Sequence, residues 1–381
     1  MIYFDSAATS FQKPPEVAEA VYRAMHTLSS PGRGGYPSAT KASEVVFECR
    51  CALQEMFGAV SPEQIIFTMN ATHALNIAIK SLVPPGGKVV ISGYEHNAVT
   101  RPLNALGAET VVAAAPLFSP KETLAAFERC ITEDTDAVIC THVSNVFGSV
   151  QPVEAIGALC RRLHIPFVID ASQSAGILTL DLQNSAATFV AMPGHKGLYG
   201  PQGTGVLICA EDAPIRTLME GGTGSRSAEA GMPDFLPDRL EAGTHNVPGI
   251  AGLLEGIRFV RQTGVGRICE SERILASAAA AGLRQLPEVD VFAGCDLFAQ
   301  TGVLSFRHPG ISSEILGGKL MEKGVSVRAG LHCAPLAHRT AGTLESGTVR
   351  ISFSPMNTPE EVFRFLDITE EIIRAGFHAQ K

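Results

Sequence analysis

The stretch "DAVICTHVSNVFGSVQPVEAIGALCRRLHIPFVID", residues 136–170, decides the fold class of this chain. It begins with an apolar run at 136–142, continues with apolar residues at helical spacing over 153–164, and ends with a second apolar run at 166–170. A buried strand followed by a helix and another buried strand is the pattern of a parallel βαβ unit. The stretch therefore predicts a parallel sheet covered by helices.

The same rhythm extends over the first two thirds of the chain. Further apolar runs lie at 64–68, 88–92, 187–192 and 205–210, and segments with helical spacing separate most of them. This alternation predicts a mainly parallel sheet with helices on both faces. The run at 205–210 follows a short loop without a helix, so we expect it to be an antiparallel member of the sheet.

The pattern changes near Asn246. Residues 246–264 have the spacing of a long helix that leads to a second unit, and the remainder mixes helices with short strands such as "VLSFR" (303–307). We therefore expect an α/β protein with two domains. The large domain would comprise residues 15–245, and a smaller α+β domain would comprise residues 1–14 and 246–381.

The composition narrows the classes of partner. Of the 381 residues 45% are hydrophobic and 18% charged, and the formal net charge is −8, without a cluster of lysines and arginines. This balance argues against nucleic acid as a main partner and against attachment to anionic membranes. The start, "MIYFDSAATS", has no basic segment followed by an apolar core, and no run approaches the roughly 20 apolar residues that span a bilayer. We expect a cytoplasmic protein without a signal peptide.

The nine cysteines predict neither a disulfide framework nor a metal site. Their number is odd, no pair has CxxC spacing, and Cys49 and Cys51 are too few for zinc. Most lie in apolar runs such as "VICTH" (138–142), which is typical of small buried hydrophobic residues. Cys333 differs, because its surroundings indicate a loop.

Polar residues follow several of the predicted strands. Ligands collect beyond the carboxyl ends of parallel strands, so these residues are the candidates for a binding site. A helix predicted to begin after Asn70 adds free backbone N–H groups, which suit an anion such as phosphate. The candidates at the strand ends are His96, Asn145, Asp170, Gln173 and Lys196, and those at the helix start are Ala71, Thr72 and His73.

Each candidate also has a simpler interpretation. A helix cap would be enough to explain Asn70 or Thr72. A lone histidine is more often a structural hydrogen-bonding group than a ligand-binding one. Lys196 and Asp170 can form a buried salt bridge. Taken together, however, a Schiff-base lysine, a buried aspartate for a pyridinium nitrogen, a histidine face and a helix N-terminus describe a pyridoxal 5′-phosphate site. The glycines around Lys196 would allow turns and a close approach of the backbone to the cofactor.

At this point the sequence resembles a known family, the class V aminotransferase group of fold-type I pyridoxal phosphate enzymes. Within that group it is most similar to the cysteine desulfurases and selenocysteine lyases. The resemblance runs nearly from end to end. It rests on "YFDSAATSFQKP" (3–14), "EHNAVTRPL" (95–103), "HVSNVFGSVQPV" (142–153), "IDASQSAG" (169–176), "PGHKGLYGPQGTG" (193–205), "EAGTHNVPGIAGL" (241–253), "VRAGLHCAP" (327–335) and "VRISFSPMNTPEEV" (349–362).

The resemblance implies a role for each candidate around the cofactor ring. Lys196 matches the Schiff-base lysine, and His195 is similar to a histidine that contacts the phosphate. Asp170 matches the partner of the pyridinium nitrogen, and Gln173 matches the ligand of the ring hydroxyl. His96 matches the histidine that stacks on the ring.

Other positions match the family's phosphate and substrate contacts. Ala71 and Thr72 lie in the phosphate loop, and Thr244 resembles a residue that reaches the phosphate of the other subunit, which implies a homodimer. Asn145 matches an active-site asparagine. Arg350 matches the arginine that holds the substrate carboxylate, a task suited to a guanidinium.

Cys333, in "RAGLHCAP" (328–335), matches the desulfurase nucleophile. We expect Arg328 and His332 to favour its thiolate form. The alternative is an inert loop cysteine. The compact motif resembles the second desulfurase type, in which an acceptor protein collects the sulfur.

The chain departs from the family pattern at three positions. Pro193 stands where a serine or threonine that touches phosphate is usual, and Ala71 stands where a second threonine is common. Tyr36, in "RGGY" (33–36), stands where the second desulfurase type has a histidine. Other groups of this chain must therefore supply part of the phosphate contacts.

The implied function is that of a pyridoxal 5′-phosphate-dependent cysteine desulfurase. It would convert L-cysteine to L-alanine and leave a persulfide on Cys333, with Lys196, Cys333, His96 and Arg350 as catalytic residues. The alternatives are a selenocysteine lyase acting on L-selenocysteine, another class V aminotransferase or lyase, and a non-catalytic relative that keeps the fold.

Overall fold

The computed structural model describes residues 1–32 and 34–378, and its centre is a seven-stranded sheet with the order β2-β8-β7-β6-β5-β3-β4. β8 runs antiparallel to both of its neighbours, β2 and β7, and the pairs from β7 to β4 are parallel. Both expectations for this sheet are thus confirmed. In sheet order the strands are β2 (Ile65–Thr68), β8 (Gly205–Cys209), β7 (Phe189–Pro193), β6 (Phe167–Asp170), β5 (Ala137–Thr141), β3 (Lys88–Ser92) and β4 (Glu109–Ala113).

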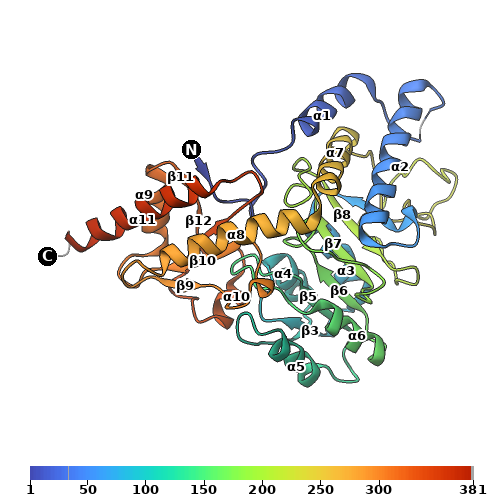
Figure 1. Cartoon of the computed structure of the whole chain (residues 1–381). Helices are drawn as coiled ribbons and strands as arrows, with labels where there is room; N and C mark the ends of the chain where they lie inside the picture. The colour runs from blue at the N-terminus through green and yellow to red at the C-terminus, as the bar shows by residue number, and fades with distance from the viewer. Residues whose placement is uncertain (33, 379–381) are drawn as a thin grey trace.

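Helices cover the two faces of this sheet (Figure 1). Because side chains alternate along a strand, both faces of β5 are apolar: Val138 and Cys140 belong to one hydrophobic core, and Ala137 and Ile139 to the other. The helices of this part are α1 (Pro15–Thr27), α2 (Pro37–Phe57), α3 (Ala71–Leu82), α4 (Asn97–Ala105), α5 (Pro120–Cys130) and α6 (Val153–Leu163), with a short 3₁₀ helix η1 (Pro62–Gln64).

Two consecutive helices connect the domains. α7 (Val247–Thr263) packs against α1 and α2, and its Leu253 and Ile257 belong to the same core as the large sheet. α8 (Val265–Leu283) instead contributes Leu275 and Leu283 to the core of the small domain. We therefore propose that the domain boundary lies between α7 and α8, at Gly264, instead of at residue 246.

The small domain is built on a four-stranded antiparallel sheet with the order β12-β13-β10-β9. β1, near the N-terminus, pairs with β11, and Phe4 packs in the same core as the four-stranded sheet. We therefore propose that the first residues belong to the small domain. The elements are β1 (Ile2–Tyr3), β9 (Asp290–Phe292), η2 (Leu297–Ala299), β10 (Val303–Arg307), α9 (Ser313–Glu322), β11 (Val325–Ser326), β12 (Arg328–Gly330), α10 (Pro335–Thr340), β13 (Thr348–Ser352) and α11 (Pro359–His378).

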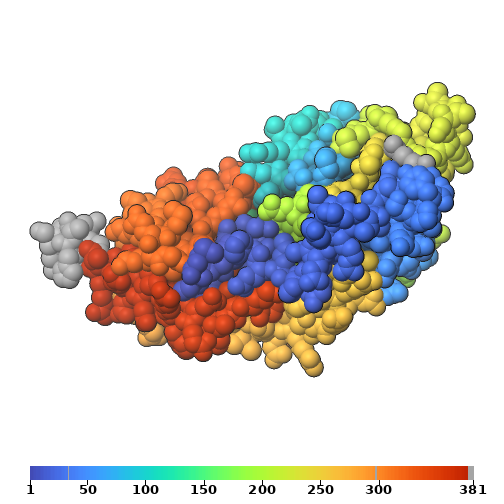
Figure 2. Space-filling view, turned by 90° about the horizontal axis from the view of Figure 1, so that it is seen from above, coloured from blue at the N-terminus to red at the C-terminus, as the bar shows by residue number. Residues whose placement is uncertain are grey.

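The N-terminal segment leaves the small domain and crosses to the large one before α1 begins. Figure 2 shows this segment lying along the surface where the two domains meet. Across residues 1–32 and 34–378, none of the helices combines the length and the apolar character that crossing a membrane requires.

Candidate active site

Lys196 lies in the loop that follows β7, at the carboxyl end of the parallel strands. Gly197 fixes this loop against its neighbour, because a Cβ atom there would lie 2.4 Å from the carbonyl oxygen of Ala175. Gly194 is restricted in the same way by the hydroxyl of Thr204, at 2.2 Å from the added Cβ. These glycines therefore serve close packing of the loop on its own protein, which differs from the expected role of admitting the cofactor.

The amine of Lys196 is suited to act as a nucleophile. Burial lowers its pKa to about 8, Asp170 opposes that shift, and Arg350 adds to it. A substantial fraction of the amine is therefore neutral near pH 8, although part of the side chain stays exposed. Only the neutral amine can attack a carbonyl carbon.

Asp170 is the last residue of β6 and is buried. Its Oδ1 accepts a hydrogen bond of 2.9 Å from the N–H of Ser172. Among the described residues no nitrogen–oxygen pair within 4.0 Å joins Lys196 to Asp170, so they do not form the direct salt bridge weighed from the sequence. The carboxylate influences Lys196 and also His96 through space.

His96 follows β3 and caps the N-terminus of α4. Its Nδ1 accepts a 3.0 Å hydrogen bond from the N–H of Ala98, which places the ring proton on Nε2. Burial lowers the pKa of His96 to about 4, against the opposing effect of Asp170. The imidazole is therefore neutral at physiological pH, as an uncharged face for a flat ligand requires.

Glu95, directly before His96, was not singled out from the sequence. The side chain is buried, and its Oε1 accepts hydrogen bonds from the Ser92 hydroxyl and, at 2.7 Å, from the N–H of Thr141. Burial raises the pKa of Glu95 to about 8, and the nearby Asp170 raises it further. Glu95 thus ties the ends of β3 and β5 together behind His96.

The N-terminal segment forms one wall of the site, which sequence periodicity did not indicate. Gln173 donates a 3.0 Å hydrogen bond from Nε2 to the carbonyl of Ala7. Nδ1 of His195 lies 3.1 Å from the hydroxyl of Thr9, and burial lowers the pKa of His195 to about 4. Gln173 and His195 are therefore both held by residues 7–9 of the same chain.

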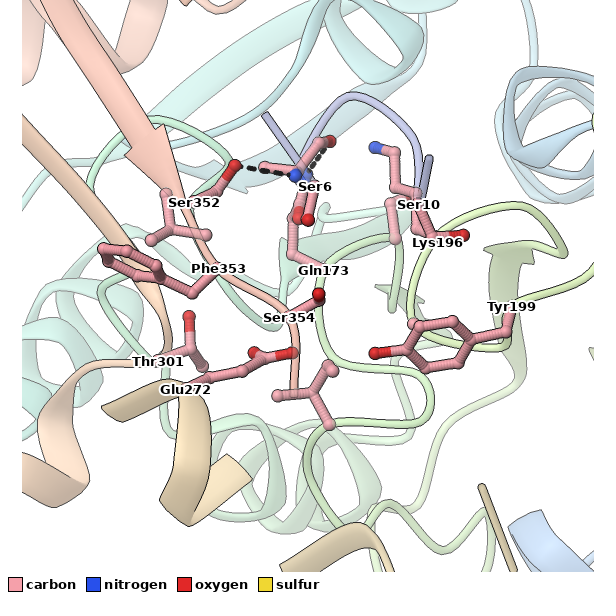
Figure 3. A pocket seen from close by; sticks show the side chains of 15 residues that line it. Ser6, Ser10, Gln173, Lys196, Tyr199, Glu272, Thr301, Ser352, Phe353 and Ser354 are labelled. Carbon is pink, nitrogen blue, oxygen red and sulfur yellow. Dashed lines mark hydrogen bonds between the residues drawn. The ribbon is translucent and has the colours of Figure 1, made fainter. Parts of the chain in front are cut away.

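A narrow cavity of about 30 Å³ extends from Lys196 along this segment, which is space for a water molecule or two. Figure 3 shows the hydroxyl of Tyr199 and the carboxyl of Glu272 pointing toward one another across its far part, while Lys196 lies near Ser10. Burial raises the pKa of Glu272 well above its usual value.

A second lysine lies close to the site. Nζ of Lys13 donates a 2.7 Å hydrogen bond to the Ser10 hydroxyl, and burial lowers its pKa to about 8. Its charge also acts on His195. Lys13 is therefore the natural comparison for Lys196 in any test of which amine carries a cofactor.

The phosphate-loop candidates occupy the first turn of α3. Asn70 caps that helix, since its Oδ1 accepts a 2.9 Å hydrogen bond from the N–H of His73. Ala71 is buried and Thr72 is exposed. Of the three N–H groups expected to be free, that of His73 is therefore used by the cap, and those of Ala71 and Thr72 remain as the candidate donors.

The remaining positions that the sequence linked to phosphate or substrate contacts are Thr244, Pro193 and Tyr36. Thr244 is exposed and lines a cavity of about 210 Å³ together with His73. No interaction among the described residues joins Thr72 or Thr244 to Lys196. Pro193 is the last residue of β7, and Tyr36 is exposed just before α2, while Arg33 of the same motif lies outside the described residues.

The loop that carries the Thr244 segment is anchored by a buried ion pair. Nη1 of Arg50 lies 2.8 Å from Oε1 of Glu241, and the same oxygen accepts a 2.6 Å hydrogen bond from the N–H of Phe67. His245 lies 3.2 Å from the other carboxylate oxygen. Arg50 and Glu241 are thus structural residues that connect α2, β2 and residues 241–245.

Arg350, on β13, is buried and already has partners on two sides. Nη2 pairs with Oδ1 of Asp5 at 2.6 Å, and Nη1 donates a 2.8 Å hydrogen bond to the carbonyl of Asn145. Its Nε has no hydrogen-bond partner among the described residues. The Nε–H group is therefore a donor without a partner in a guanidinium that is buried from solvent.

Cys333 is exposed on the loop between β12 and α10. Its Sγ lies 3.3 Å from Nη2 of Arg328, so the guanidinium stands directly beside the sulfur. Nδ2 of Asn145 donates a 2.9 Å hydrogen bond to the carbonyl of His332, and the N–H of Asn97 donates one of 2.8 Å to the carbonyl of Cys333.

The expected contribution of His332 to the thiolate was wrong. Burial lowers the pKa of His332 to about 2, and Arg350 lowers it further, so the ring is neutral. Both of its nitrogens face other protein groups. Of Arg328 and His332, only Arg328 places a positive charge beside the sulfur of Cys333.

Comparisons with known proteins agree with this arrangement. A sequence profile described as aminotransferase class-V matches residues 2–365. A probable cysteine desulfurase of Mycolicibacterium paratuberculosis is 34% identical over 388 residues, which cover 99% of this chain and 56% of that protein. A probable cysteine desulfurase of Pyrococcus abyssi is 32% identical, with 98% of this chain and 95% of that protein covered. The chain spans 56% and 62% of the length of two mycobacterial relatives.

Two solved structures have a fold similar to that of this chain. An apo cysteine desulfurase from Thermococcus onnurineus matches with a TM-score of 0.90 and 32% identity, covering 98% of this chain and 95% of the other. The cysteine desulfurase CsdA from Escherichia coli, an S-sulfonic acid form, matches with a TM-score of 0.86 and 25% identity, covering 98% and 94%.

Proposed function

The chain belongs to the class V aminotransferase family, and on that premise we propose that it is a pyridoxal 5′-phosphate-dependent cysteine desulfurase. The observation that carries the proposal is the meeting of two groups of residues. Lys196, Asp170 and His96 lie at the carboxyl ends of the parallel strands. Cys333 lies on a small-domain loop bonded to Asn97, the residue after His96.

The residues present fit the cofactor. Asp170 is a buried carboxylate without an ion-pair partner within 4.0 Å among the described residues, which suits a protonated ring nitrogen. Lys196 provides an amine with a pKa of about 8, and the neutral His96 provides an uncharged ring. When bound, pyridoxal phosphate supplies an electron sink for bonds broken at the substrate α-carbon and beyond.

Arg350 and Lys196 would hold and activate the substrate. The guanidinium of Arg350, whose Nε–H has no partner among the described residues, would bind the substrate carboxylate. Lys196 would take the proton from the α-carbon and return it. Both groups come from elements fixed by packing, so the α-carbon is held in place while the proton moves.

Cys333 would accept the sulfur. Its thiolate, with the sulfur 3.3 Å from Nη2 of Arg328, would form a bond to the substrate sulfur while the substrate Cβ–S bond breaks. The carbon keeps the electron pair of that bond and takes up a proton, which gives alanine. The sulfur remains on Cys333 as a persulfide, and its exposed position leaves room for an acceptor protein.

We also propose a homodimer. Several large apolar side chains are exposed on or beside α1 and α2 and before α3, where a second copy would cover them. Thr244 is exposed on the side of His73, as expected for a residue that reaches a neighbouring subunit. The exposed side chains are Phe11, Tyr22, Met25, Tyr36, Phe47 and Met69.

Replacing the sulfur acceptor tests the function. Cys333→Ser should retain the cofactor, because Lys196 and Asp170 are unchanged, and should lose release of alanine and sulfide from L-cysteine. Cys295→Ser, at the other exposed cysteine among the described residues, is the matched control and should keep both products. Normal desulfuration by Cys333→Ser would exclude the persulfide route, and a strong preference of the wild type for L-selenocysteine would indicate a lyase instead.

A further inference from the structure

Three side chains form a continuous hydrogen-bond chain beneath the loop that carries Cys333. The hydroxyl of Thr343 lies 2.8 Å from Nδ1 of His338, and Nε2 of His338 lies 3.2 Å from Nδ1 of His332. Nε2 of His332 lies 3.2 Å from the carbonyl oxygen of Arg328. All three side chains are buried, and the two rings are nearly parallel, 13° apart.

The donor and the acceptor in each of these hydrogen bonds follow from the Arg328 carbonyl at one end of the series. A carbonyl oxygen can only accept, so Nε2 of His332 donates to Arg328. A neutral imidazole carries one proton, so Nδ1 of His332 accepts from His338. Nε2 of His338 carries the single proton of that ring, so its Nδ1 accepts a hydrogen bond from the Thr343 hydroxyl. The other possible acceptor for this hydroxyl, the His338 carbonyl, lies farther away at 3.5 Å.

Burial keeps both rings in the neutral state that this chain requires. It lowers the pKa of His332 to about 2 and that of His338 to about 4. A second proton on His332 would place two donors face to face at 3.2 Å, because Nε2 of His338 already donates to that nitrogen. The tautomers are therefore fixed over the whole physiological range.

The segment held by the chain has an uncommon backbone. His332 and Cys333 have φ angles of 53° and 56°, in the left-handed region that residues with a side chain seldom adopt. Two successive residues of this kind persist only where their surroundings fix them. Here the side chain of His332 is tied to Arg328, and its carbonyl is tied to Asn145.

We propose that His338 is a positioning residue, which acts through His332 to hold Cys333 at the guanidinium of Arg328. The hydrogen-bond chain joins the backbone carbonyl of Arg328 to the residue before Cys333, so it fixes the backbone from which both partners of the 3.3 Å contact between guanidinium and sulfur extend. His338 itself lies beneath the loop, packed beside Phe147, and does not touch the sulfur. The role in sulfur transfer rests on the proposed function, whereas the positioning of Cys333 does not.

The test compares two replacements of His338 in the cofactor-loaded enzyme. His338→Phe keeps a ring of similar size and removes the donor to His332, whereas His338→Gln keeps an N–H donor at the same reach. The main readout is the alkylation rate of Cys333 by iodoacetamide at fixed pH, measured by peptide mapping. Cys295, exposed on a different part of the small domain, is the internal reference.

We expect His338→Phe to slow alkylation of Cys333 at least threefold and to lower kcat on L-cysteine about tenfold. The alkylation of Cys295 and the absorbance of the bound cofactor should not change. His338→Gln should restore alkylation and kcat to within about threefold of the wild type. An unchanged or faster alkylation of Cys333 in His338→Phe, or a His338→Gln no better than His338→Phe, overturns the proposal.

A milder pair of variants covers the case in which His338→Phe does not fold. Thr343→Val removes only the donor at the far end of the chain and should slow alkylation of Cys333 in the same direction. Thr369→Val is its control, because Thr369 is also buried and donates a 2.7 Å hydrogen bond within α11, away from the loop. Equal alkylation rates in these two variants contradict the proposal. A wild type that makes no alanine defeats the proposed function and leaves the alkylation result intact.

Discussion

The guanidinium of Arg350, on β13, is paired with the carboxylate of Asp5, 345 residues earlier in the chain, through a contact of 2.6 Å between Nη2 and Oδ1. Burial lowers the pKa of Arg350, and Asp5 opposes that shift. The residue assigned to the substrate carboxylate therefore already holds a carboxylate of its own chain. Substrate must share the guanidinium with Asp5 or displace it.

This relationship predicts the effect of Asp5→Asn. Without the competing charge, Arg350 should bind the substrate carboxylate more tightly, so KM for L-cysteine should fall severalfold. The lost ion pair should lower the free energy of unfolding by about 1–3 kcal/mol, because Arg350 is buried and Asp5 is partly exposed. Steady-state kinetics and urea unfolding measure the two effects.

Asp290→Asn is the matched control, since its pair with Arg307 lies at the surface. We expect the free energy of unfolding of Asp290→Asn to change by less than about 1 kcal/mol and its KM for L-cysteine to stay unchanged. A KM that rises in Asp5→Asn would show that Asp5 assists substrate binding and does not compete with it.

Two lysines distinguish which amine carries the cofactor. Lys196→Ala should abolish turnover and the visible absorbance of the bound cofactor. Lys13→Ala should retain that absorbance, although Lys13 also has a pKa near 8 and lies beside Ser10. Absorbance spectra of both purified variants decide the matter, and the reverse result would reassign the cofactor to the N-terminal segment.

The rate at which apoenzyme incorporates cofactor should depend on pH through Lys196. Its amine is protonated below a pKa of about 8 and neutral above it, so the rate should rise with pH through about 8 and then level off. At pH 6 only about one amine in a hundred is neutral, since each pH unit is a factor of ten. Stopped-flow absorbance against pH measures the midpoint.

Asp170→Asn provides the comparison for that midpoint. The Asp170 carboxylate raises the pKa of Lys196, so its removal should shift the midpoint below about 8. A midpoint that stays in place, or moves upward, would mean that Asp170 does not act on this amine.

The ion pair between Arg50 and Glu241 should matter for stability more than for chemistry. Glu241→Gln leaves the Arg50 guanidinium buried without a countercharge, and the free energy of unfolding should fall by about 3–5 kcal/mol. Glu229→Gln, in an exposed pair with Arg226, should change it by less than about 1 kcal/mol. Equal losses in the two variants would contradict the structural role assigned to Glu241.

Local sequence patterns predicted most of the large sheet but missed its edge strand β4. Apolar runs of strand length separated by helical spacing predicted the parallel sheet, and the missing helix before 205–210 predicted that β8 is antiparallel. The strand-end rule also placed His96, Asp170 and Lys196 at one edge, because parallel strands all end on the same side. The motifs resembling class V aminotransferases then indicated the family.

The sequence alone determined the fold class, the family and the residues at the strand ends, because each depends on spacing within a few tens of residues. Tertiary structure alone decided that Asp5 pairs with Arg350, that Lys13 lies near His195, and that α7 packs with the large domain. These contacts join segments far apart in the chain, and no local period encodes which distant surfaces will meet. His332 shows the same limit at short range: its position suggested a charge beside Cys333, and burial made the ring neutral.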